Sequence, residues 1–251
     1  MLLNCDLGES YGSWTIGNDA KAMAHINQAN IACGFHAGDP LIMQTTLRSA
    51  KAHGVMVGAH PAYPDLVGFG RRSMNCSSAE IVAFMHYQIA AIDGMATCEG
   101  TKLAYVKPHG ALYNDMMSKD AVRQSIMQAV SHYNTAHNKQ LKLMLQSTTQ
   151  ASSHQAEATA LGLELYFEAF ADRGYEDDGR LMARSKTGAV LDHSHMMQQV
   201  AQLLSQGTIT STNGVCLNLQ VDSLCVHGDN QAGIDAIKDI RALIEQQAAA
   251  D

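Results

Sequence analysis

Short apolar runs alternate with longer amphipathic stretches along most of this chain, and no other feature limits the fold as strongly. Seven runs have the length of buried strands: Leu2–Asp6, Asn30–Cys33, Val55–Ala59, Ala104–Lys107, Leu141–Gln146, Glu164–Phe170 and Leu224–His227. A repeated strand-then-helix order implies parallel strands joined by right-handed crossovers. About seven such units in 251 residues predict an α/β fold with a closed or nearly closed barrel rather than an open sheet.

Start and stop signals for helices stand between these runs. Asp39 precedes a proline at a predicted helix start, and Gly54 is expected to end that helix. Ser77 begins a stretch with the spacing of a capping box, and Gly94 is the expected stop. Ser118 is expected to cap a further helix. A last apolar stripe at helical spacing lies near the C-terminus: Ile234, Ile237, Ile240 and Ile244. Core packing explains such stripes.

No proline-rich linker, charge block or low-complexity tract divides the sequence. We therefore expect residues 1–251 to form a single domain. Two long stretches without a helix or strand signal remain, Tyr63–Ser73 and Asp172–Ser185. Loops of this length in a compact domain are usually functional or mobile.

The charge and cysteine content disfavours several classes of function. The chain has 24 acidic against 17 basic residues and a formal net charge of −7, which argues against a nucleic-acid or anionic-membrane partner. The N-terminus lacks the basic region of a signal peptide, and no apolar stretch approaches the roughly 18 residues needed to cross a bilayer. The six cysteines are scattered without a C-x-x-C pair, as expected for reduced thiols. We expect a cytoplasmic protein.

Polar and charged side chains gather where the predicted strands end. Because the carboxyl ends of all strands of a parallel barrel meet on one face, these side chains are predicted to share one site. They are Asp6 and Glu9; His36 and Asp39; His60; Lys107, His109, Tyr113 and Asn114; Glu168, Asp172 and Arg173; and His227 and Asp229. A single strand-end histidine is usually structural, but repetition at one topological position predicts a polar active site.

Two chemistries remain open for this site. One is a divalent metal that activates water, for which the suitable groups are Asp6, His36, His60, His109 and His227. The other is metal-free acid–base hydrolysis, with Lys107 or Arg173 stabilising an oxyanion. The chain has no H-E-x-x-H motif and no H-x-H pair on a predicted strand, so the residues alone do not decide between them.

Motifs for covalent nucleophiles and for nucleotides are missing from the sequence. There is no G-x-S-x-G elbow, and we interpret Cys5 and Cys33 as packing groups rather than nucleophiles. There is also no G-x-x-x-x-G-K-[ST] phosphate loop. Arg71 and Arg72 could still bind a carboxylate or phosphate through paired hydrogen bonds. Nucleotide chemistry is therefore expected to need another polypeptide of a complex.

Six strings resemble, in order, the motif set of the LamB/YcsF family. They are NCDLGE at 4–9, NIACGFHAGD at 30–39, GAHP at 58–61 with GFGRR at 68–72, VKPHGALYN at 106–114, EAFADR at 168–173 and CVHGD at 225–229. The match runs from residue 4 to about residue 230. Gly174 and Asn230 stand where the family pattern leads us to expect alanine and threonine, and neither change removes a reacting group.

The resemblance implies a seven-stranded β/α barrel related to the polysaccharide deacetylase and glycoside hydrolase–deacetylase barrels. It also implies an ATP-dependent cyclic amide hydrolase, in which this chain is the A component of 5-oxoprolinase and works with B and C subunits. The reaction would convert 5-oxo-L-proline to L-glutamate while the complex consumes ATP, with Mg²⁺ accompanying the nucleotide.

Within that reaction we assign each strand-end group a hypothetical role. Asp6, His36, His60 and His109 would form the acid–base or metal centre. Lys107 or Arg173 would hold the substrate carboxylate or the developing oxyanion, and Asp172, His227 and Asp229 would orient them. Substrate contacts are expected from Glu9, Asp39, Arg71, Arg72, Tyr113, Asn114, Glu168 and Asp229.

Two other functions remain open. One is a free-standing metal-dependent deacetylase or amidohydrolase that acts on an acylated sugar or a small amide. The other is a non-catalytic component that binds a small acid. Tightly bound metal would favour the first, and activity of the complex without the strand-end histidines would favour the second.

Overall fold

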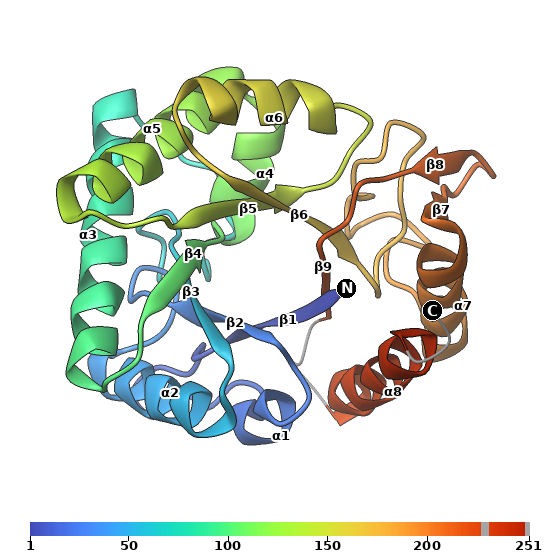
Figure 1. The fold of residues 1–251 in the computed structure, drawn as a ribbon, viewed down its shortest axis with the longest axis horizontal. Coiled ribbons are helices and arrows are strands. Elements are labelled where there is room, and N and C mark those ends of the chain that lie inside the picture. Colours follow the sequence, from blue (N-terminus) through green and yellow to red (C-terminus); the bar gives the residue numbers. More distant parts are fainter. Residues whose placement is uncertain (227–230, 249–251) are drawn as a thin grey trace.

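The computed structural model describes residues 1–226 and 231–248 and contains a closed barrel of seven parallel strands. The strands follow one another round the barrel in chain order (Figure 1): β1 (Leu2–Leu7), β2 (Gln28–Ala32), β3 (Met56–His60), β4 (Leu103–Val106), β5 (Lys142–Gln146), β6 (Leu165–Phe170) and β9 (Ser223–Cys225). The barrel closes where β1 pairs with β9, with Leu3 opposite Leu224. The predicted barrel is confirmed, and each of its seven strands overlaps the predicted run.

Helices lie around the outside of the barrel (Figure 1): α1 (Asp19–Met23), α2 (Pro40–His53), α3 (Ser78–Cys98), α4 (Gly110–Ser118), α5 (Asp120–His137), α6 (Ala151–Ala160), α7 (His193–Gln206) and α8 (Gln231–Ala248). An antiparallel hairpin of β7 (Thr208–Thr210) and β8 (Cys216–Asn218) stands between α7 and β9. The strand–helix alternation predicted the barrel, but it did not predict this hairpin.

Local sequence signals explain two of the helices. Asp39 caps α2 by accepting from two backbone N–H groups of the first turn, and Gly54 ends it in the left-handed conformation at φ 67°. At the start of α3, Ser77 accepts from the N–H of Glu80 while the Glu80 carboxylate accepts from the N–H of Ser77. The predicted helix start at Asp39 and the predicted capping box are confirmed.

Two predicted helix boundaries are wrong. Gly94 does not end α3, because a glycine inside a helix costs only about 1 kcal/mol and Ala96, beyond it, is buried in the core. Ser118 does not cap a helix, because it is the last residue of α4 and its hydroxyl donates to a carbonyl one turn earlier. α5 begins behind Lys119, whose side chain makes no capping hydrogen bond within the described chain.

Apolar packing fills the layer between the strands and the helices. β2 is buried along its whole length, and α3 and α5 pack against each other with Ile89 and Ile126 fully buried. The predicted C-terminal stripe lies on α8, where Ile237, Ile240 and Ile244 are buried. Burying one such side chain contributes about 1.5–3 kcal/mol, so this layer supplies much of the stability of the barrel.

The interior of the barrel, by contrast, is polar. Alternate strand residues point into a barrel, and here they include Asn4, Asn30, Tyr105 and Glu168, all buried. Hydrogen bonds join strands that are not neighbours: Tyr105 on β4 donates to Asn30 on β2 at 2.6 Å. This polar interior leads to the carboxyl ends of the strands, where the predicted site lies.

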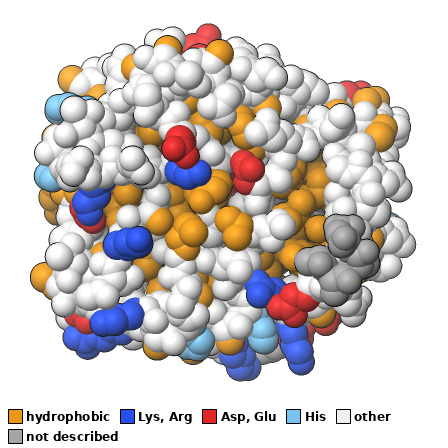
Figure 2. All heavy atoms as spheres, in the orientation of Figure 1, with side chains coloured by type: hydrophobic (Ala, Val, Ile, Leu, Met, Phe, Trp, Pro, Cys, Tyr) orange, Lys and Arg blue, Asp and Glu red, His pale blue; other side chains and the backbone are white. Residues whose placement is uncertain are grey.

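The face drawn in Figure 2 carries no broad basic patch. Hydrophobic side chains gather toward the middle of this view, and the lysines and arginines are scattered singly or beside acidic side chains. Among residues 1–226 and 231–248, no helix has both the length and the apolar character needed to span a membrane.

Candidate active site

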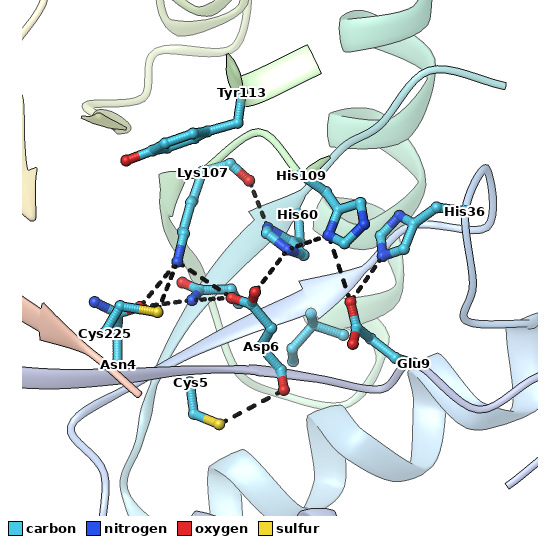
Figure 3. A network of polar contacts seen from close by, with 12 residues as sticks. Asn4, Cys5, Asp6, Glu9, His36, His60, Lys107, His109, Tyr113 and Cys225 are labelled. Carbon is cyan, nitrogen blue, oxygen red and sulfur yellow. Dashed lines mark hydrogen bonds and ion pairs between the residues drawn. The ribbon is translucent and has the colours of Figure 1, made fainter. Parts of the chain in front are cut away.

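Residues from four separate strand ends meet at the carboxyl end of the barrel (Figure 3). Asp6 lies near the end of β1, His60 is the last residue of β3, and Lys107 directly follows β4. His109 precedes α4, and Cys225 ends β9. The structure therefore brings together groups that the sequence pattern placed at one topological position.

Lys107 is buried (2% exposed) and surrounded by acceptors. Its Nζ lies 2.9 Å from Glu168 Oε2 and 3.2 Å from Asp6 Oδ1. Burial opposes the charge, but the carboxylates of Asp6 and Glu168 raise the pKa of Lys107 well above its ordinary value. Tyr113 donates to the other Glu168 oxygen at 2.7 Å. A buried ammonium group thus lies between two carboxylates.

Two amides fix the orientation of the Asp6 carboxylate. The Asn30 amide nitrogen donates to Asp6 Oδ1 and to Asn4 Oδ1, both at 2.8 Å, while its carbonyl oxygen accepts from Tyr105. Lys107 donates to the same Asn4 oxygen at 3.1 Å. The Lys107 ammonium group can only donate and the Asp6 carboxylate can only accept. The Asn4 amide oxygen must therefore face Lys107, and the Asn30 amide nitrogen must face Asp6. Asp6 Oδ1 accepts both donors, so Oδ2 is held toward the histidines.

Two histidines turn lone-pair nitrogens toward each other. His60 Nδ1 lies 2.7 Å from the carbonyl oxygen of Lys107, and His109 Nε2 lies 2.9 Å from that of Phe69. Since carbonyls only accept, these nitrogens carry the proton of each neutral imidazole and the other nitrogens carry lone pairs. Those two nitrogens, His60 Nε2 and His109 Nδ1, lie 3.0 Å apart. Asp6 Oδ2 lies 3.4 Å from His60 Nε2.

Glu9 and His36 complete the cluster. Glu9 Oε1 lies 3.1 Å from His36 Nε2 and 3.5 Å from His109 Nδ1. The His36 ring stacks on that of His109 with centroids 3.8 Å apart. Burial lowers the pKa of His36 and of His109 well below the ordinary value, and neighbouring histidines add to this effect. His36 Nδ1 is buried and has no hydrogen-bond partner among the described residues.

A cavity of about 530 Å³ lies beside this cluster. Its polar lining includes Asp6, Glu9, His60, Lys107 and His109, and its apolar lining includes Tyr113, Met117, Phe170 and Met182. Guanidinium groups come from Arg71, Arg173, Arg180 and Arg184. The volume is typical of a small-molecule site. The cavity therefore combines acid–base groups, cations and apolar surface.

Several predicted site residues lie elsewhere. Asp39 caps α2 and lines a separate cavity of about 250 Å³. Arg72 pairs with an aspartate of its own loop, and its side chain is 66% exposed. Arg72 and Asp172 are not among the described residues that line the larger cavity. His227 and Asp229 lie outside the described residues.

Arg173 does line the larger cavity, but its guanidinium group is already engaged. Nε donates to the carbonyl oxygen of Ala189 at 3.0 Å, and Nη2 donates to that of Met182 at 2.5 Å. These contacts hold the loop that follows β6. Asn114, by contrast, is an exposed residue of the cavity lining.

The structure adds residues that the strand-end pattern did not predict. Asn4 and Asn30 interrupt apolar strand runs, and the pairing of Asp6 with Asn30 between β1 and β2 places them together. A polar residue within an apolar strand run is the sequence signal that could have identified both asparagines. Arg180 and Arg184 belong to the long loop after β6, whose length suggested function without indicating which residues contribute.

Comparison with known proteins gives consistent results. The LamB/YcsF family pattern matches residues 1–250. A protein named as the A component of 5-oxoprolinase from Pseudomonas fluorescens (strain Pf0-1) is 48% identical over 250 residues, covering 99% of this chain and 98% of the relative. A protein of the same name from Vibrio parahaemolyticus is 44% identical over 242 residues, covering 96% and 94%.

Among solved structures, the lactam utilization protein from Thermus thermophilus superposes with a TM-score of 0.89 at 35% identity, covering 99% of this chain and 97% of that one. A truncated 3-deoxy-D-arabino-heptulosonate 7-phosphate synthase from Thermotoga maritima, 8% identical, has a TM-score of 0.53 with 100% and 87% coverage, and it shares the fold alone. From the ordered motifs, the closed barrel and these matches, the chain belongs to the LamB/YcsF family.

Proposed function

We propose that this chain opens the lactam ring of 5-oxoproline to give glutamate, as the A component of a multi-subunit, ATP-consuming 5-oxoprolinase. The names of its relatives, the A component of 5-oxoprolinase and lactam utilization protein, support the proposal. The observation that carries it is the approach of Asp6 Oδ2 to His60 Nε2, 3.4 Å apart, in a cavity that Lys107 also lines.

Ring opening consumes one water molecule. The water oxygen bonds to the lactam carbonyl carbon while a proton passes to a base, and the carbon–nitrogen bond breaks as the nitrogen gains a proton. The resulting carboxylate and amine complete glutamate. Asp6 would be the base, because donors hold its Oδ1 and direct its Oδ2 toward His60. Asp6, once protonated, would return this proton to the leaving nitrogen.

The rest of the lining would hold the substrate. The methylene groups of 5-oxoproline would pack on the rings of Tyr113 and Phe170. Its carboxylate would pair with Arg71, whose guanidinium carbon lies 5.1 Å from the centre of the Phe69 ring. Lys107, whose three N–H groups already point to Asp6, Glu168 and Asn4, would stabilise the developing oxyanion through its positive charge rather than by a direct hydrogen bond. We prefer Arg71 to Arg173 because backbone carbonyls already occupy two donors of Arg173.

ATP would be used by the assembled complex, together with the B and C subunits. Amide resonance makes a lactam hard to open, and transfer of the ATP γ-phosphoryl group to its carbonyl oxygen would remove that resonance and release ADP. Ring opening by water would then give an acyl phosphate, and a second water molecule would release inorganic phosphate and leave glutamate. The chain itself has no phosphate-loop motif, so the nucleotide would be held by a partner, with Mg²⁺ bound to its phosphates. The assembled enzyme would work in the cytoplasm.

The proposal is tested by glutamate release from 5-oxoproline and ATP, using the chain alone and the chain with its B and C subunits. We expect release only from the mixture. A mixture that assembles and stays folded but releases no glutamate would rule out this substrate.

A second function is favoured by the cluster of Glu9 with three histidines. It is metal-dependent hydrolysis of an acylated sugar or small amide by the chain alone. Amide hydrolysis without partner subunits, lost on chelation and restored by metal, would support it. A non-catalytic role would follow instead if replacing both His60 and His109 left turnover by the complex unchanged.

A further inference from the structure

The cluster of Glu9, His36, His60 and His109 contains more acceptors than donors. One ligand atom from each residue lies within 4.8 Å of the others, and all four residues are buried. The protons of His60 Nδ1 and His109 Nε2 already go to backbone carbonyls. Their remaining nitrogens and the Glu9 carboxylate therefore turn lone pairs toward a common point.

Acceptors at such distances repel one another unless a cation lies between them. His60 Nε2 and His109 Nδ1 are 3.0 Å apart, and Glu9 Oε1 is 3.5 Å from His109 Nδ1. His36 Nε2 can donate to Glu9 Oε1 at 3.1 Å, so the pair of facing acceptors is His60 Nε2 and His109 Nδ1. A divalent ion satisfies all the lone pairs at once.

We propose that Glu9, His36, His60 and His109 bind one divalent transition-metal ion. Three imidazole nitrogens and one carboxylate oxygen are a donor set that suits zinc and its neighbours, whereas Mg²⁺ prefers oxygen ligands. Two ligands of one zinc ion lie at most about 4.2 Å apart, so the widest pair would have to close slightly on binding.

Asp6 is not part of this ligand set, although the sequence pattern grouped it with the three histidines. Its Oδ1 accepts from Asn30 at 2.8 Å and from the Lys107 ammonium group at 3.2 Å. A metal ion at that oxygen would face a buried positive charge. Glu9 supplies the carboxylate instead, and Asp6 Oδ2 lies beside the proposed ion, 3.4 Å from His60 Nε2.

The loop over the histidines is built to hold them in place. Phe69 adopts φ 54°, a left-handed conformation that is unfavourable for a bulky residue, and its carbonyl accepts from His109 Nε2. A Cβ on the next residue, Gly70, would lie 2.8 Å from His36 Cβ and 2.9 Å from His109 Cδ2. The backbone thus packs directly on two ligands and fixes which nitrogen of His109 is protonated.

A bound ion would lower the pKa of a water molecule in the cavity and polarise a carbonyl group. The proposed metal site is inferred from the four side chains alone, so it does not depend on whether the substrate is 5-oxoproline. Metal binding is measured without turnover, so failure of this inference and failure of the proposed 5-oxoprolinase function are distinguishable.

The test uses the full chain, stripped of metal and titrated with Zn²⁺ by calorimetry and with Co²⁺ by visible absorption. We expect one ion per chain and the absorption bands of imidazole-bound Co²⁺. His60→Ala and the nearly isosteric Glu9→Gln should each weaken Zn²⁺ binding by about 100-fold or more. The control is His53→Ala, which replaces an exposed histidine of α2 and should bind as the natural chain does.

Circular dichroism shows whether each variant is folded, and Glu9→Gln carries the test if His60→Ala does not fold. Absence of one-to-one binding by the natural chain would overturn the inference. Equal Zn²⁺ affinity in Glu9→Gln and His53→Ala would overturn it as well.

Discussion

The barrel end contains two buried polar regions that differ in how donors match acceptors. Around Lys107, the ammonium group and two amides supply donors to Asp6 and Glu168, and the hydrogen bonds form a continuous network. A few ångströms away, the protons of His60 and His109 are used by backbone carbonyls and acceptors face acceptors.

The difference indicates separate roles for neighbouring residues. A buried network with matched donors and acceptors stabilises one arrangement of the chain. Removing one charged member leaves its partner as an uncompensated charge, which lowers stability. A group of buried acceptors that face one another does not stabilise the fold and is a candidate ligand site. We therefore expect substitutions at Lys107 to lower both stability and activity, and substitutions in the histidine cluster to act mainly on activity.

The largest effect is expected from Lys107→Met. Removing the ammonium group leaves the buried Glu168 and the half-buried Asp6 without their cation, which should lower the free energy of unfolding by about 3–5 kcal/mol and abolish turnover. Urea denaturation measures the loss. The control is Lys119→Met, because its ion pair with Asp115 involves a lysine side chain that is 51% exposed and should contribute less than about 1 kcal/mol. Equal losses in both variants would contradict the assigned roles.

His109→Ala should act mainly on activity. The barrel should stay folded and lose less of its free energy of unfolding than in Lys107→Met, because relief of the contact between lone pairs partly offsets the lost hydrogen bond to Phe69 and the lost stacking on His36. Turnover of 5-oxoproline by the assembled complex should fall by about 10²–10⁴-fold in kcat. Turnover close to that of the natural chain would remove His109 from the mechanism.

The metal-free chain should lose stability as the pH falls below about 6.5, the ordinary pKa of histidine. Burial lowers the pKa of His36 and of His109, so the folded chain leaves them unprotonated where the unfolded chain takes up protons. Each contributes at most about 1.4 kcal/mol per pH unit. Urea denaturation at several pH values should give a shallower slope for His109→Ala than for the natural chain, and identical slopes would count against the buried neutral form.

The smallest expected effect separates two adjacent arginines. Arg71 lines the cavity, whereas Arg72 pairs with Asp65 outside it. Arg71→Ala should raise the KM for 5-oxoproline about tenfold through loss of a charged hydrogen bond, while Arg72→Ala should change it less than about twofold. Steady-state kinetics of the complex measures both, and a larger KM change in Arg72→Ala would reverse the assignment.

The sequence predicted the barrel well because its signals are local. Apolar runs of strand length and caps such as Asp39 act within a few residues, and both are present in the structure. The misplaced boundaries have a different origin. Tertiary packing of α3 outweighs the weak helix preference of Gly94, and Ser118 ends α4 because its backbone remains in the preceding helix.

The gathering of the site was also predictable, since parallel strands bring their carboxyl ends to one face. By itself the sequence determined the fold, the family motifs and the identities of groups such as Asp6, His60 and Lys107. Only the tertiary structure decided that Glu9 joins the histidines, that Lys107 lies between carboxylates and that Arg173 holds a loop. The physical reason is that the matching of donors to acceptors depends on distances between residues far apart in the chain, which no local pattern contains.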